Sequence, residues 1–144
     1  MQAINITFLV DVIGALSHGT LRNNIFMADN GLDSQGNGTE ALITTCCPGQ
    51  PVNWVVYAID VQTPVLIRAI TFIDIAKEDD QQLIARAFER PPEKGGDPHW
   101  FYWSGIIPRS LKPGLYRYSL KLQMGKGVHS TMSSDAAALA VVKH

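Results

Sequence analysis

The chain has 144 residues, with 12 basic and 13 acidic side chains and a formal net charge of −1. This length is enough for one domain with a hydrophobic core and is short for two. The balanced charge argues against a basic surface that would attract nucleic acid or anionic lipid. We therefore expect a single domain over residues 1–144 with no nucleic-acid partner and no membrane partner.

The first residues alternate between apolar and polar side chains. Residues 1–7 lack the basic segment that begins a signal peptide, and Ile4 to Asp11 has the two-residue period of a strand. Charged residues interrupt the longest apolar runs well before the roughly 20 residues that a membrane-spanning helix needs. We expect the chain to begin with a strand and the protein to be cytoplasmic.

Further runs in the N-terminal half predict strands because β-branched and aromatic residues concentrate in them and turn-forming residues separate them. These strands are expected over residues 24–29, 40–46, 52–60 and 65–75. A polar connection punctuated by glycine is expected over residues 14–24. The run 65–75 is apolar on both faces apart from Arg68, Thr71 and Asp74, which predicts a place in the middle of a sheet.

Residues 77–90 leave two alternatives open. Acidic residues lead, and apolar residues recur at helical spacing between Leu83 and Phe88, which is typical of a short amphipathic helix. Residues 83–88 fit a short edge strand equally well. Loops are expected over residues 91–98 and 125–134, and the alanine-rich run 136–142 is either a last strand or a helix.

Four consecutive aromatic residues, from Trp100 to Trp103, mark a strand in the C-terminal half. Successive side chains of an extended chain point to opposite faces, so Phe101 and Trp103 share one face while Trp100 and Tyr102 take the other. The next strand, 115–124, is apolar on one face only. These two patterns fit a central strand and a half-exposed strand of a two-layer sandwich.

We therefore predict an all-β fold, a single-domain antiparallel β-sandwich of about seven to eight strands, with room for one short helix near residues 77–90. No phosphate-binding glycine loop and no nucleophile elbow are present in the sequence. The four histidines show no paired spacing for zinc. We expect no enzymatic activity, no catalytic residues and no cofactor.

Several strand and turn motifs together resemble a known family. They are Leu9-Val10-Asp11-Val12, Ile25-Phe26-Met27-Ala28-Asp29, Trp54, Tyr102-Trp103-Ser104-Gly105, Pro113-Gly114-Leu115-Tyr116-Arg117-Tyr118 and Asp135. In these residues, spread over nearly the whole chain, the sequence resembles the bacterial inclusion-body protein family of the PixA/AidA type. The resemblance implies a cytoplasmic, non-enzymatic, all-β protein that self-associates, and we expect a homodimer or a larger homo-oligomer.

A carbohydrate-binding module is the alternative function. Aromatic rings on a rigid sheet can stack on a sugar ring while nearby polar groups bind its hydroxyls. Trp100 and Tyr102, with Asp97 and His99 from the preceding loop, are the candidate ligand-binding residues. The competing interpretation is that most of these rings belong to the core. We expect at least one of Trp100 and Trp103 to be exposed.

Residues 29–40 have the length of a calcium-binding loop. Gly31 and Ser34 break the EF-hand pattern, but a looser calcium site could use the side-chain oxygens of the candidate ligands. These candidates are Asp29, Asp33, Asn37 and Glu40. A solvated hairpin loop is the other interpretation, since glycine and asparagine supply the positive φ angles of turns.

The two cysteines, Cys46 and Cys47, are adjacent. Consecutive Cα atoms lie about 3.8 Å apart, below the usual disulfide range of roughly 4.4 to 6.8 Å, so the pair does not cross-link the fold. We interpret them as partly buried small hydrophobic residues that end a strand. A reactive thiol with a lowered pKa stays open as the alternative.

Overall fold

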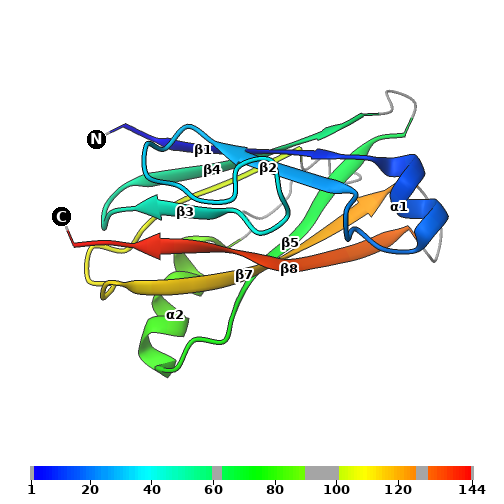
Figure 1. The fold of residues 1–144 in the computed structure, drawn as a ribbon. Coiled ribbons are helices and arrows are strands. Elements are labelled where there is room, and N and C mark those ends of the chain that lie inside the picture. Colours follow the sequence, from blue (N-terminus) through cyan, green and yellow to red (C-terminus); the bar gives the residue numbers. More distant parts are fainter. Residues whose placement is uncertain (1, 60–62, 90–100, 126–129, 144) are drawn as a thin grey trace.

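The computed structural model describes residues 2–59, 63–89, 101–125 and 130–143, and these form two four-stranded sheets packed face to face (Figure 1). Sheet A has the strand order β2-β1-β4-β6, and sheet B has the order β3-β8-β7-β5. The strands of sheet A are β1 (Ile4–Val10), β2 (Ile25–Asp29), β4 (Pro51–Ala58) and β6 (Tyr102–Ile106). Those of sheet B are β3 (Ile43–Cys46), β5 (Val65–Ile73), β7 (Gly114–Met124) and β8 (Thr131–Val141). The predicted all-β sandwich is confirmed.

The pairing within the sandwich is mixed, so the expectation of purely antiparallel sheets was wrong. β1 runs parallel to β4 and β3 runs parallel to β8, whereas the other neighbouring strands of both sheets are antiparallel. Both parallel pairs join strands that are distant in the sequence. The chain begins and ends at the same end of the sandwich, opposite helix α1 (Figure 1).

Alternating apolar side chains build the core, as the two-residue period predicts. In β1 the residues Ile4, Ile6, Phe8 and Val10 are buried, and their neighbours in the strand face outward. The largest buried side chain is that of Trp54, in the middle of sheet A. Its ring meets the rings of Phe88 and Tyr118 edge to face, at centroid distances of 5.2 and 5.5 Å.

A short helix, α1 (Val12–His18), covers the start of the segment 14–24, where a polar connection without a helix was expected. That expectation was wrong because two local signals outweigh the weak helix propensity of the segment. The side chain of Asp11 caps the helix by accepting a hydrogen bond from the backbone N–H of Gly14 (3.0 Å). Gly19 ends the helix with a left-handed φ of 71°.

Residues 77–90 contain a helix, α2 (Glu78–Ala87), which settles one of the open alternatives. Three acidic residues occupy its first turn, where they interact favourably with the helix dipole. Ile84 and, just past the helix, Phe88 are buried in the core. The indole N–H of Trp103 donates a 2.9 Å hydrogen bond to the carbonyl of Phe88. Through these contacts α2 closes the side of the sandwich between β5 and β6.

Two strands that were predicted to lie in the middle of a sheet lie at an edge. β5 and β6 each lie at the edge of a sheet, although apolar residues on both faces predicted central strands. For β5 the reason is α2: it packs against this strand, and the side chain of Gln81 donates to the carbonyl of Phe72 (2.9 Å). For β6 the prediction relied on four consecutive aromatic residues, but the strand begins only at Tyr102 and contains two of them.

The last strand, β8, is longer than expected. It covers Thr131–Val141, so the expected loop 125–134 was too long, and the alanine-rich run 136–142 is strand and not helix up to Val141. Ala137 and Leu139 belong to the hydrophobic core, and Ala138 is also buried. The register of β8 against β7 shifts between Tyr118 and Leu120.

Candidate functional site

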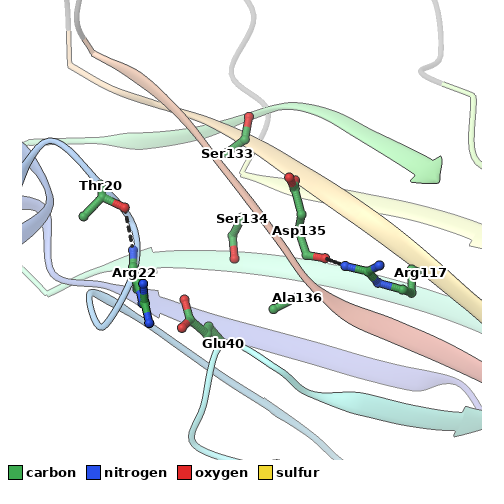
Figure 2. A pocket seen from close by; sticks show the side chains of 8 residues that line it. All are labelled: Thr20, Arg22, Glu40, Arg117, Ser133, Ser134, Asp135 and Ala136. Carbon is green, nitrogen blue, oxygen red and sulfur yellow. Dashed lines mark hydrogen bonds between the residues drawn. The ribbon is translucent and has the colours of Figure 1, made fainter. Parts of the chain in front are cut away.

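A polar hollow lies beside the part of β8 that precedes its pairing with β3. β3 has four residues and β8 has eleven, so β3 pairs with β8 only over Ala138–Val141. The connection before β2 and the segment before β3 lie against the uncovered part of β8 (Figure 2). The resulting open hollow has a volume of about 300 Å³. It is lined by Thr20, Arg22, Glu40, Arg117, Ser133, Ser134, Asp135 and Ala136.

The irregularity in β8 shapes this hollow. Tyr118 pairs with Ala137 and Leu120 with Ser134, so β8 contains one residue more than β7 over this stretch. Both Asp135 and Ala136 are consequently exposed, against the usual alternation. A bulge of this kind turns a side chain away from its regular direction and ends regular pairing at an edge.

Two of the four charged side chains in the hollow are held by contacts within the protein. Arg117 forms an ion pair with Asp74 (2.7 Å) and also donates to the backbone carbonyl of Asp135 (3.0 Å). The hydroxyl of Ser119 donates to the carboxylate of Asp135. These groups are exposed, so the contacts position the side chains more than they stabilise the fold.

The other two charged side chains are available. Within the described ranges, the guanidinium of Arg22 and the carboxylate of Glu40 have no hydrogen bond or ion pair, and Figure 2 shows them on the side of the hollow away from Arg117. Together with the hydroxyls of Ser133 and Ser134 they offer donors and acceptors to a small polar molecule. No sequence pattern predicts this hollow, because its residues come from four separate segments and no spacing links them.

The four candidate calcium ligands are not gathered into one site. The carboxylate of Asp29 accepts hydrogen bonds from the hydroxyl of Thr44 (2.7 Å) and the N–H of Gly31 (2.8 Å), and Asn37 accepts from the N–H of Asp29 (3.0 Å). Glu40 lines the hollow beside β8, and Asp33 lines a different one. Over residues 2–59, 63–89, 101–125 and 130–143, no three His, Cys, Asp or Glu side chains come together as metal ligands. Calcium binding stays a prediction.

Of the four candidate sugar-binding residues, the structure describes only Tyr102. Trp100, Asp97 and His99 lie outside the described residues. Tyr102 is 60% exposed on the outer face of β6, whereas Trp103 is 6% exposed and belongs to the core. The expectation of one exposed tryptophan at position 100 or 103 therefore depends on Trp100.

The adjacent cysteines are both free thiols, and Cys46 is buried while Cys47 is partly exposed. Burial, with smaller contributions from Cys47 and Asp29, raises the pKa of the Cys46 thiol from 9.0 to about 12. Cys46 is consequently protonated at neutral pH and is a poor nucleophile. The interpretation of Cys46 as a small hydrophobic residue at a strand end agrees with this placement.

The outer face of sheet A is a second candidate surface. Strand register places Leu9 of β1 beside Phe26 of β2 and Tyr57 of β4, and all three side chains are exposed. We call these three residues the apolar row. Their alternation with buried residues was visible in the sequence, but only the strand order brings them side by side.

The comparisons with known proteins concern the fold and the family. A crystal structure of the inclusion body protein PixA from Burkholderia cenocepacia is similar to this chain with a TM-score of 0.67 and 12% identity, covering 98% of this chain and 96% of that one. At this identity the similarity shows a shared fold. No curated protein matches the sequence. No helix in the part of the chain that the structure describes is long and apolar enough to cross a membrane. A family model matches residues 2–130, and the chain therefore belongs to the family described as domain of unknown function DUF8788.

Proposed function

We propose that this protein is a non-enzymatic protein that self-associates, in the manner that the name of its structural neighbour, an inclusion body protein, suggests. The observation that carries the proposal is the exposed apolar row on sheet A. Clustered apolar side chains on the surface mark interaction sites more often than isolated ones do. Charged side chains would oppose the approach of identical copies, and the near-zero net charge of the chain reduces that repulsion.

The shared fold supports this proposal over nearly the whole chain. The overlap with the inclusion body protein includes both sheets, since 98% of this chain is covered. The expected cytoplasmic location and the homodimer or larger homo-oligomer belong to the same proposal. Assembly of many copies further requires a second contact that does not close on itself.

Sedimentation velocity of the purified protein, run from dilute solution to the highest attainable concentration, tests the proposal. We expect the average mass to increase with concentration beyond the monomer mass of 15.8 kDa. A monomer at every concentration would refute self-association. Light scattering on the same samples would show whether assembly stops at a dimer.

A carbohydrate-binding module is the second candidate, favoured by the exposed ring of Tyr102. An exposed aromatic ring on a sheet can stack on the apolar face of a sugar. A glycan array probed with calcium and with a chelator tests this function. We expect binding that is lost in Tyr102→Ala, and calcium dependence would implicate residues 29–40. Absence of binding to every glycan in both conditions would remove the candidate.

A further inference from the structure

The outward-facing residues of sheet A are uncharged along all four strands, which the structure describes completely. In β1 and β2 these residues are Asn5, Thr7, Leu9, Phe26 and Ala28. In β4 and β6 they are Pro51, Asn53, Val55, Tyr57, Tyr102, Ser104 and Ile106. A solvent-facing sheet normally carries charged side chains on its outer face. This face therefore differs from an ordinary solvated surface.

The residues on this face are sorted into rows across the sheet. The apolar row lies near the α1 end. The next row contains Ala28, Thr7, Val55 and Tyr102 in register. A third row contains Asn5, Asn53 and Ser104, and the amide of Asn53 donates to the side-chain oxygen of Asn5 (3.0 Å). A fourth row, Pro51 and Ile106, is apolar again, so the face alternates between apolar and neutral polar rows and carries no charge.

The outer face of sheet B has a different chemistry. Arg68 of β5, Arg117 and Lys121 of β7, and Asp135 of β8 all point outward there. Charges of this kind keep a sheet surface in contact with water. The contrast between the two faces indicates that the outer face of sheet A, and not that of sheet B, is an interaction surface.

From this chemistry, and resting on the proposed self-association, we infer that a second copy of this chain packs face to face on the outer face of sheet A. A two-fold axis in the interface and parallel to the strands exchanges β1 with β4 and β2 with β6. Each row then meets the same row of the second copy, so apolar side chains cover apolar ones. Asparagine amides carry both donors and acceptors, so the polar rows can also pair with themselves.

The size of the face sets the strength of this contact. Four strands spaced about 4.8 Å apart, on average about six residues long at about 3.3 Å per residue, give a flat footprint of roughly 380 Å² before the relief of the side chains is added. Stable interfaces bury about 800 Å² per partner. The pairing is therefore of modest size and depends on concentration.

Two substitutions on sheet A and one matched control on sheet B test the inference. Leu9→Glu and Tyr57→Lys each place a charge within the apolar row, and we expect the dissociation constant of the wild-type assembly to rise at least about tenfold in each. Leu115→Glu adds the same charge to the outer face of sheet B, at a leucine 56% exposed against 43% for Leu9. We expect this control to associate as the wild type does.

Mixing the two sheet A variants separates a lost contact from a damaged fold. The two-fold axis brings Leu9 of one copy near Tyr57 of the other, so a Leu9→Glu chain and a Tyr57→Lys chain should recover association with each other. Single variants that associate normally, or a mixture that stays dissociated, would overturn the inference while leaving self-association intact. A wild type that is monomeric at all concentrations would overturn the proposed function itself.

Discussion

Two tyrosines of β7 show how similar side chains can have opposite effects on stability. The hydroxyl of Tyr116 donates a 2.7 Å hydrogen bond to the carbonyl of Lys112. The hydroxyl of Tyr118 is fully buried beside the indole N–H of Trp54, and neither group makes a hydrogen bond of normal geometry among the described residues. A buried polar group without a partner costs free energy, whereas a hydrogen bond made in the native state contributes about 1 kcal/mol.

This contrast predicts different results for the two phenylalanine substitutions. Tyr118→Phe should leave the free energy of unfolding unchanged or raise it by up to about 1 kcal/mol, because it removes an unpaired hydroxyl. Tyr116→Phe should lower it by about 1 kcal/mol, because a hydrogen bond is lost. Urea unfolding followed by tryptophan fluorescence measures both. A clear loss of stability in Tyr118→Phe would mean that its hydroxyl has a partner in solution.

The burial of Cys46 predicts unequal reactivity of the two thiols. In the native protein Cys47 should react with a thiol reagent at neutral pH, while Cys46 should react only as the protein unfolds. Counting the labelled thiols by mass spectrometry, with and without denaturant, measures this difference. The variant Cys47→Ser provides the control, since its native form should take up no label quickly.

The raised pKa of Cys46 also predicts how stability depends on pH. The pKa is higher in the folded state, at about 12, than the ordinary value of 9.0, so folding favours the protonated thiol. This contribution is complete below pH 9.0 and is lost as the pH rises toward 12. Unfolding by urea across this range should show decreasing stability, and Cys46→Ala should decrease less steeply. Equal slopes in the two proteins would contradict the assignment.

At the scale of elements, the contact between α2 and β6 has little free space. A methyl group added at Gly105 would lie 2.4 Å from the carbonyl oxygen of Ala87 and 2.4 Å from the ring of Phe88. At Gly114 the nearest atom to an added methyl would be a ring carbon of Tyr116 at 3.7 Å, an ordinary contact. Neither glycine has a positive φ, so space alone distinguishes them.

Alanine substitutions at these two glycines therefore test whether α2 closes the sandwich as described. Gly105→Ala should lower the free energy of unfolding by about 1 to 3 kcal/mol, as overpacked sites do. Gly114→Ala should change it by less than about 1 kcal/mol, because the backbone there accepts a side chain without strain. Thermal unfolding by circular dichroism gives both values. Equal effects would mean that α2 does not rest on β6.

The elements differ in how much of them the sequence could predict. Alternation identified β1 and β7 because each strand has one face in the core and one outside. Apolar residues on both faces wrongly predicted that β5 and β6 are central strands. The helix α2 covers this edge of the sandwich, and a strand covered by a helix carries the same apolar residues as a strand covered by another strand. The polar hollow depends on where β3 begins and on the bulge beside Asp135, and neither feature has a local signal.

For the whole molecule, the difference between its two outer faces predicts how association responds to salt. Opposed surfaces without charged side chains gain nothing from charge attraction, so screening should not weaken their contact. We expect the dissociation constant to stay constant or to fall as sodium chloride is raised, because excluded salts favour apolar burial. Sedimentation equilibrium at low and high salt measures the effect. Dissociation at high salt would point to an interface on charged sheet B.

The parallel pairing of β3 with β8 has a consequence for the order of folding. Ile43 pairs with Ala138, so the partner of β3 lies 95 residues later in the chain. Contacts this distant in sequence form late, because closing a long loop costs chain entropy. During synthesis on the ribosome β3 cannot pair until β8 has emerged, and we expect the thiols of Cys46 and Cys47 to remain accessible until then. Oxidative damage at these thiols is therefore a hazard of the nascent chain, and the completed fold shields Cys46 from it.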